Sequence, residues 1–289
     1  MGILFAVVAL FAWGIGDFLI QKSARKFGSL LALFYVAGFF SVCLLPFVYK
    51  DLPAMFTQFS YGLVILIIAG LVNLVANIFD FKALRIGKIS IVEPVFAFEV
   101  VVTAVLASVL IKEMLTPIQL ILVALIVSGI FLISVKSFRD LRKIKVEDGV
   151  WLAILAMIGM GTGNFVMGEG SRATNPFLMN WYTGVFIFIS LGLYFIYTPR
   201  HERVQIKEDF RNGWLLIILV GFFDALAWLA FSFSTLTTPI AISTAISESY
   251  IVLAALLGII FNRERLRKHQ VAGLLITVVS AIILAYLTA

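Results

Sequence analysis

Charged side chains are scarce in this sequence of 289 residues. They make up 13% of the chain, whereas hydrophobic residues make up 62% and the mean hydropathy is +1.09. A soluble domain of this length could not cover its surface with so few charges. The charges also fall between apolar runs of about 18 to 24 residues, the length that crosses about 30 Å of hydrocarbon. The sequence therefore predicts an all-α integral membrane protein, surrounded by the lipid bilayer and without a soluble domain.

Side chains that carry metal, redox or phosphate chemistry are also nearly absent. The single cysteine, Cys43, excludes an intramolecular disulfide. Both histidines, His201 and His269, lie in charged loops, so we expect no zinc site, no cofactor and no enzymatic centre built on clustered histidines. No G-x-x-x-x-G-K-[ST] loop occurs, so the sequence does not support ATP-driven transport by this chain. The first apolar run lacks a basic segment before it, so we expect no cleavable signal peptide.

The apolar runs predict ten transmembrane helices. The expected spans are 2–21, 29–48, 61–81, 88–111, 117–135, 149–168, 176–197, 213–233, 238–261 and 270–288. A basic cytoplasmic linker over 136–148 divides them into two groups of five. The expected organisation is a first five-helix repeat over 1–135 and a second over 149–289.

Two internal alignments indicate that these halves are repeats. Residues 81–119 match residues 232–270 when shifted by 151 positions, and the shared E-x-L-x-x-x-Q signature pairs Glu113 with Glu264, Leu115 with Leu266 and Gln119 with Gln270. A shift of 147 positions places Gly14, Gly16, Asp17 and Phe18 on Gly161, Gly163, Asn164 and Phe165. A duplicated membrane half is typical of secondary transporters.

The distribution of positive charge predicts that the second repeat is inverted. Five spans are an odd number, so the second half must enter the membrane from the opposite side. Every Lys and Arg except Lys50, Lys112 and Arg172 falls in an odd-numbered loop. Positive loops stay in the cytoplasm, so both termini are expected outside. The net charge of +6 reflects this bias and requires no nucleic-acid partner.

Taken together, these features resemble a known family. Ten spans, an inverted repeat, Trp13-Gly14 in the first span and the repeated E-x-L-x-x-x-Q corner are similar to the drug/metabolite transporter superfamily, specifically its EamA-like members. The resemblance covers essentially the whole chain. It implies a solute carrier with alternating access and a central cavity between the halves, but no particular substrate. We interpret Glu113 and Glu264, which match the recurrent glutamate of the family, as structural caps near helix ends.

Three carboxylic acids fall near the centre of predicted spans: Glu99, Asp224 and Glu248. Such groups are costly in a membrane and usually face a cavity or a partner. No Lys or Arg lies at comparable depth in the sequence, and burial disfavours the charged form, so an acid there tends to stay protonated. This suits proton relay or cation binding. For any one acid, a hydrogen bond from a protonated carboxyl group to a neighbouring helix is an equally good interpretation.

Further candidates for substrate binding or coupling are polar or aromatic residues at helical spacing. Asn73 and Asn77 lie one turn apart and match Asp224 and Trp228 in the second repeat, so both pairs are expected on a cavity wall. The other candidates are Asn164, Thr244 and Tyr250. Aromatic rings suit an aromatic or cationic solute. Packing between helices is the competing interpretation for the asparagines and hydroxyl side chains.

Two acids are expected nearer the membrane surface. Asp17 lies close to Lys22 and is interpreted as an interfacial ion pair, or as a gate if the cavity opens there. Glu93 precedes Pro94, which loosens a helix, and is placed with Asp17 at the interface. Asp80 is expected to be interfacial as well.

The sequence favours a secondary active transporter that moves a small organic solute, such as a metabolite, amino acid or drug-like compound, across a prokaryotic cell membrane by alternating access. Protons are the candidate coupling ion. A flippase for a lipid-linked solute is the alternative, and a channel is not favoured because no ring of repeated charges is present. The transporter is expected to act as a monomer or a homodimer. The solute, the coupling ion and the choice between import and export stay open.

Overall fold

The computed structural model describes residues 1–53, 61–86, 95–135, 150–197, 200–250, 253 and 267–288, and every element within them is a helix. Six of these helices are long and apolar enough to cross a membrane. The predicted all-α membrane class is therefore confirmed. Parts of the fourth and ninth predicted spans lie outside these residues, so the count of ten remains a prediction.

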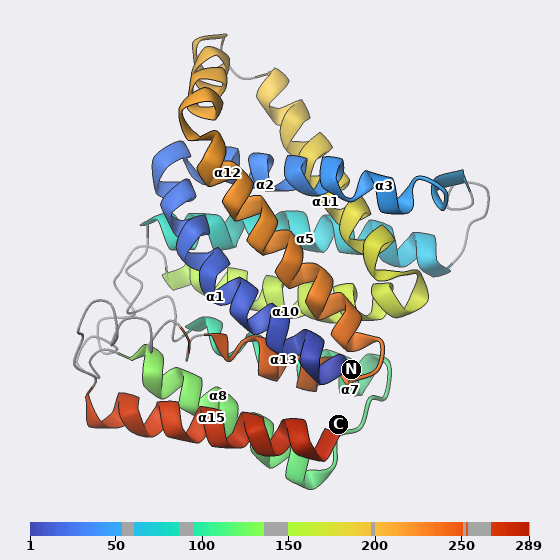
Figure 1. The fold of residues 1–289 in the computed structure, drawn as a ribbon, viewed down its shortest axis with the longest axis vertical. Helices are drawn as coiled ribbons and strands as arrows, with labels where there is room; N and C mark the ends of the chain where they lie inside the picture. Colours follow the sequence, from blue (N-terminus) through green and yellow to red (C-terminus); the bar gives the residue numbers. More distant parts are fainter. Residues whose placement is uncertain are drawn as a thin grey trace.

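The helices stack side by side in one bundle (Figure 1). They are α1 (Gly2–Phe27), α2 (Ser29–Cys43), α3 (Leu45–Val48), α5 (Tyr61–Ile86), α7 (Glu99–Leu110), α8 (Pro117–Ser134), α10 (Val150–Ala173), α11 (Pro176–Ile196), α12 (Arg200–Thr235), α13 (Ile240–Ser247) and α15 (Lys268–Thr288).

Helices of the first half pack mainly on helices of the second. The most extensive contacts join α1 to α12, α5 to α10, α8 to α15 and α2 to α11. Exchanging each helix for its counterpart in the other repeat maps this set of pairs onto itself. The halves therefore interlock around an approximate two-fold axis and share one apolar core.

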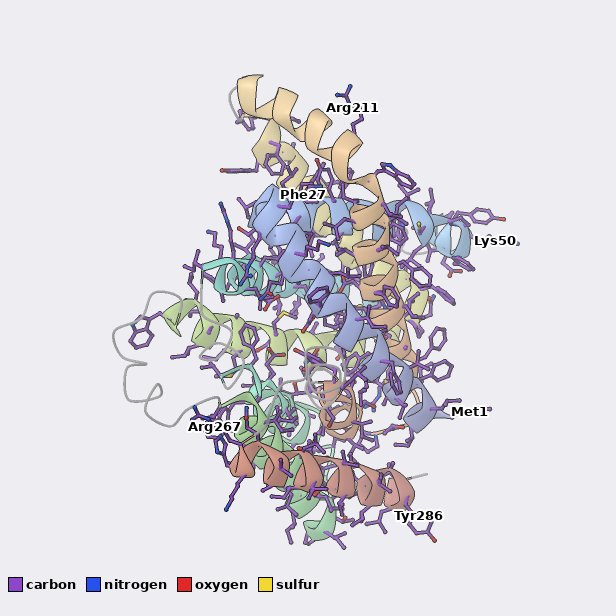
Figure 2. The ribbon with its side chains drawn as sticks, turned by 60° about the vertical axis from the view of Figure 1, so that its left-hand side comes forward. Met1, Phe27, Lys50, Arg211, Arg267 and Tyr286 are labelled. Carbon is purple, nitrogen blue, oxygen red and sulfur yellow. The ribbon has the colours of Figure 1, made fainter. Side chains whose placement is uncertain are left out.

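Equivalent helices of the two repeats run in opposite directions. Gly2, at the start of α1, lies against the turn over residues 234–238. Arg172, in the last turn of α10, donates to the carbonyl oxygens of Thr235 and Thr238 in the same turn. The beginning of α1 and the end of α10 are thus at one end of the bundle, as an inverted repeat requires. Figure 2 places Met1, Lys50 and Tyr286 on one side and Arg267 on the other.

Close helix contacts repeat between the halves with the same residue types. A β-carbon at Gly70 of α5 would overlap the ring of Phe186 in α11, and one at Gly221 of α12 would overlap the ring of Phe39 in α2. Gly70 and Gly221 are equivalent in the sequence repeat. Glycine lets a bulky ring approach the backbone at both places, which is how membrane helices pack closely.

The repeated glutamine of the E-x-L-x-x-x-Q motif has the same structural role in both copies. The Gln119 side-chain oxygen accepts a hydrogen bond from the Thr116 backbone N–H at 2.9 Å, and Gln270 accepts one from Arg267 at 3.0 Å. Each glutamine reaches back three residues to satisfy an amide at a helix start, as in a capping box. The motif is therefore a helix start signal.

Several predicted boundaries were wrong. Helices α1 and α5 continue to Phe27 and Ile86, beyond the predicted ends at 21 and 81. The span 29–48 is broken near Leu44, where Pro46 in α3 lacks an N–H donor. The loop expected over 198–212 is helical from Arg200 onwards, since it holds good helix formers and neither Gly nor Pro until Gly213.

Candidate functional site

Two helix breaks at equivalent positions mark the centre of the bundle. A turn at Ala97 and Phe98 precedes α7, and a turn at Glu248 and Ser249 follows α13. The shift of 151 residues that aligns the repeats places the first turn on the second. Discontinuous helices leave backbone polar groups without partners in their own helix, and transporters place such breaks at their binding sites. This symmetry locates the candidate site beside both breaks.

A cavity of about 50 Å³, called here the central cavity, lies beside these breaks. It is lined by residues of α1, α5, α10 and α12 and of the two broken segments: Trp13, Asp17, Asp80, Leu84, Phe96, Glu99, Met160, Asn164, Trp228, Glu248 and Tyr250. Four of these side chains are carboxylic acids, and none is Lys, Arg or His. The central cavity therefore favours a positively charged or proton-donating guest over an anion.

Polar contacts hold the acids of the central cavity in place. The Tyr250 hydroxyl donates a hydrogen bond to the Asp17 carboxylate. The Asn164 amide nitrogen lies 3.5 Å from a carboxylate oxygen of Glu248, and Asn164 itself is 1% exposed. Glu99 is also buried. The acids are thus built into the interior with neighbours from other helices.

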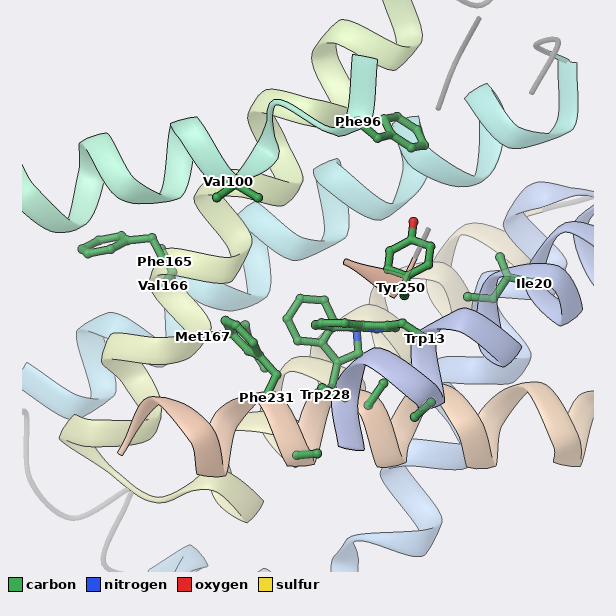
Figure 3. Close-up of a cluster of buried hydrophobic side chains, with 14 of the residues drawn as sticks. Trp13, Ile20, Phe96, Val100, Phe165, Val166, Met167, Trp228, Phe231 and Tyr250 are labelled. Carbon is green, nitrogen blue, oxygen red and sulfur yellow. The ribbon is translucent and has the colours of Figure 1, made fainter. Parts of the chain in front are cut away.

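Two tryptophans form the aromatic wall of the central cavity. The rings of Trp13 in α1 and Trp228 in α12 meet edge to face, with centroids 5.3 Å apart and an interplanar angle of 90°. Phe231 contacts both rings (Figure 3). Figure 3 also shows Tyr250 beside the tryptophan pair, with Phe96 further along the same space. Such a wall can stack on a flat ring or attract a cation.

A second cavity of about 40 Å³ lies among α2, α5, α10, α11 and α12. Its polar lining residues are Asn73, Asn77, Asn180, Thr183 and Asp224. Trp228 borders this second cavity as well as the central one.

Neither cavity is large enough for an organic solute in this conformation. Volumes of about 40 and 50 Å³ have room for about one to four water molecules. A wider hollow of about 590 Å³ opens at the end of the bundle that carries Lys50, between the ends of α3 and α10 and the starts of α5 and α11. The two inner cavities are therefore small, whereas this wider hollow, called here the vestibule, is lined by polar residues such as Asp51, Glu169 and Arg172.

An ion pair closes the structure next to the vestibule. An Arg172 guanidinium nitrogen lies 2.9 Å from the Glu113 carboxylate, and the second carboxylate oxygen accepts a 2.7 Å hydrogen bond from the backbone N–H of Ile240. Glu113 thus caps the start of α13, in agreement with its interpretation as a helix cap. The pair joins the end of α7, the end of α10 and the turn before α13.

The structure brings most of the predicted residues to the two cavities. Asp17, Asn164, Trp228, Tyr250 and the acids Glu99 and Glu248 line the central cavity, whereas Asn73, Asn77 and Asp224 line the second. Thr244 lines neither; it is fully buried and its hydroxyl donates to the carbonyl of Ile240. Glu93 lies outside the described residues.

The sequence placed Asp17 and Asp80 near the membrane surface, with Asp17 as an interfacial ion pair or as a gate if the cavity opens there. In the structure both line the central cavity. Helices α1 and α5 continue well past these acids. Sequence reasoning also missed Asn180 and Thr183, although an asparagine and a threonine three residues apart within an apolar span were a visible signal.

Comparison with known proteins agrees with this architecture. The model of the EamA-like transporter family matches residues 1–135 and again residues 148–286. The chain therefore belongs to the EamA-like transporter family, a family of multi-pass membrane transporters, as its resemblance to the drug/metabolite transporter superfamily predicted.

A solved structure titled "Crystal structure of protein" is similar with a TM-score of 0.71 at 13% identity, over 99% of this chain and 97% of that one. At that identity the likeness shows the fold alone. No curated protein matches the sequence.

Proposed function

We propose that this protein is a secondary active transporter of small organic cations, including amines and zwitterions with an apolar or aromatic part, in a prokaryotic plasma membrane. The observation that carries the proposal is the central cavity, where acids of both repeats share one space with the Trp13–Trp228 pair. A cation in that space would be attracted by the carboxylates and by the ring faces. No basic side chain among the described residues lines the cavity.

Alternating access follows from the inverted repeat in this proposal. Equivalent broken helices from the two halves flank the central cavity, so a small tilt of one half against the other would widen it towards one side at a time. The Glu113–Arg172 pair would close the Lys50 end of the bundle when the cavity faces the opposite end. Protons and the cationic solute would bind the same carboxylates in turn, because a carboxyl group that carries a proton no longer attracts a cation.

A ligand screen tests the substrate class. The purified protein in detergent would be heated with amino acids, polyamines, quaternary amines, aromatic amines, nucleosides, sugars and sugar phosphates. A bound ligand stabilises the folded state by mass action, so a substrate raises the melting temperature. We expect aromatic and quaternary amines to raise it, and Glu99→Gln or Asp17→Asn to remove the effect. A response confined to sugars or phosphates would contradict the cation proposal.

A further inference from the structure

The second cavity is built from equivalent residues of the two repeats. The shift of 147 positions carries Ser29, where α2 begins, onto Pro176, where α11 begins. Under this shift, each of the four α2 residues that line the cavity falls on an α11 residue that also lines it. The four pairs are Leu33 with Asn180, Val36 with Thr183, Ala37 with Gly184 and Phe40 with Ile187. Equivalent faces of α2 and α11 therefore form two of its walls.

Helices α5 and α12 repeat this pattern. The shift of 151 positions pairs Asn73 with Asp224 and Asn77 with Trp228, and all four residues line the cavity. Met167 is the one lining residue among those described that has no such counterpart. A cavity formed by equivalent residues of both halves must lie on their approximate two-fold axis. Transporters with inverted repeats place substrate sites at this interface.

One layer of helix contacts separates the second cavity from the central cavity. A β-carbon on Gly16 of α1 would lie 3.9 Å from the backbone nitrogen of Asp224, and one on Gly163 of α10 would lie 3.0 Å from the side-chain oxygen of Asn73. In both helices the residue after the glycine lines the central cavity. Trp228 lines both cavities. A solute that stacks on Trp228 in the central cavity therefore lies next to the second one.

The lining of the second cavity suits an apolar guest. Its α2 wall is entirely apolar. The amide nitrogens of Asn73, Asn77 and Asn180 donate to the backbone carbonyls four residues earlier, at 3.0, 2.8 and 2.8 Å. The Thr183 hydroxyl donates to the carbonyl of Met179 at 2.9 Å. Because each of these side chains has a hydrogen-bond partner in its own helix, none of them needs a polar guest as a partner.

The size of the second cavity limits the size of that guest. An apolar cavity of about 150 Å³ holds benzene, so a volume of about 40 Å³ corresponds to one or two carbon atoms. We propose that the second cavity receives a short alkyl group of the transported cation, while the ammonium group stays among the acids of the central cavity. This assignment deepens the proposed function and rests on it. It makes the α2 and α11 walls determinants of substrate specificity.

A series of aromatic amines tests the assignment. The ligands are phenethylamine, the parent compound, and its para-methyl, para-ethyl and para-tert-butyl derivatives. Apparent affinities come from the rise in melting temperature with ligand concentration. We expect the para-ethyl compound to bind wild type about 4- to 15-fold more tightly than the parent, since each buried carbon contributes about 4-fold. The para-tert-butyl compound should bind no more tightly than the parent, because four carbons exceed the volume.

Ile187→Ala enlarges the second cavity and should change this preference. The ratio of para-tert-butyl to parent affinity should rise at least 3-fold over that of wild type. Ile187→Val is the milder variant and should shift the ratio in the same direction. Ile126→Ala is the matched control, since Ile126 is fully buried on α8, which lines neither cavity, and its ratios should equal those of wild type. Each ratio is taken within one protein, so a loss of stability in a variant cancels.

The outcomes separate this assignment from the function on which it rests. If no amine of the series binds wild type, the proposed transport of organic cations is overturned, and the assignment with it. If the amines bind but the para-ethyl group adds no affinity, or the para-tert-butyl compound binds as tightly as the para-ethyl one, the assignment alone is overturned. The same holds if Ile187→Ala and Ile126→Ala give equal ratios.

Discussion

Arg172, in the last turn of α10, and Glu113, in the segment between α7 and α8, form an ion pair at 2.9 Å although 59 residues separate them in the sequence. Arg172 also donates to the carbonyl oxygens of Thr235 and Thr238 at 2.6 and 2.9 Å. Three backbone groups of the corner between α12 and α13 thus converge on this guanidinium and this carboxylate: the carbonyls of Thr235 and Thr238 and the N–H of Ile240. We call this pair the strap, because it links α10 to the corner between α12 and α13 at the Lys50 end of the bundle. In the proposed transport cycle, opening that end would require the strap to part.

Removal of one partner of the strap should destabilise the closed end. For Glu113→Gln or Arg172→Met we expect a loss of about 1–3 kcal/mol in unfolding free energy, less than for a fully buried pair because the Arg172 side chain is 27% exposed. Differential scanning calorimetry on purified variants measures it. Tyr61→Phe, which removes a 3.2 Å hydrogen bond to Glu169 on the exposed rim of the vestibule, is the control and should change little. Equal losses in all three variants would contradict a special role for the strap.

The close approach of α5 and α11 depends on Gly70. In Gly70→Ala the new methyl group would overlap the Phe186 ring, so we expect a loss of about 1–3 kcal/mol from overpacking. Phe186→Leu should recover part of the loss when combined with Gly70→Ala, as a double-mutant cycle of melting temperatures would show. Gly192→Ala is the control, since its methyl group would lie 3.6 Å from the Phe34 ring, an ordinary contact. A neutral Gly70→Ala would refute the close contact.

The tryptophan pair should contribute to affinity for aromatic cations. In Trp228→Phe we expect binding of an aromatic amine to weaken about 3- to 30-fold, the range of a cation–π contact. The measurement is the ligand-dependent shift in melting temperature. Phe231→Leu alters a ring that contacts both tryptophans but does not line the cavity, so affinity should stay within about 3-fold of wild type. A reversed order of these effects would place the solute elsewhere.

Both termini should be reachable from outside the cell. The positive loops predict this orientation, and the two chain ends lie at the same end of the bundle (Figure 1). Cys43 is the single cysteine, so Cys43→Ser provides a background for a cysteine inserted directly after Met1, which is 92% exposed, or replacing Tyr286, which is 83% exposed. An impermeant maleimide should label both positions in intact cells and should not label a cysteine at Arg25. Labelling of Arg25→Cys alone would invert the orientation.

Much of the fold could be predicted from local sequence properties. The length of the apolar runs and the confinement of charges to the segments between them predict membrane helices, because a helix pairs its own backbone polar groups inside the hydrocarbon layer. The repeated Glu113 and Gln119 positions predicted the two-repeat organisation, and the structure shows why they recur: each glutamine satisfies an amide at a helix start. The acids Glu99 and Glu248 were expected at a cavity because a carboxyl group is costly inside a membrane and usually faces a cavity or a polar partner.

Other features depend on tertiary packing and could not be predicted. The break beside Glu248 has no Gly or Pro between Ile240 and Ser249, so the sequence indicates a continuous helix there, whereas Pro94, three residues before the turn at Ala97, was a local signal for the first break. Asp17 and Asp80 were assigned to the interface because nearby lysines suggested a helix end, but α1 and α5 continue beyond them. Asn180 was overlooked because its partner, Ser232, lies on another helix and no spacing connects them.

Transport in proteoliposomes tests the central claim most directly. Uptake of a radiolabelled aromatic amine would be measured for wild type, for Asp17→Asn, Glu99→Gln and Glu248→Gln, and for Asp51→Asn, whose carboxylate lies in the vestibule and accepts a hydrogen bond from Asn175. The account predicts uptake by wild type and Asp51→Asn, and at least a 10-fold loss in each central-cavity variant with normal insertion. Undiminished uptake in all three central variants would contradict it.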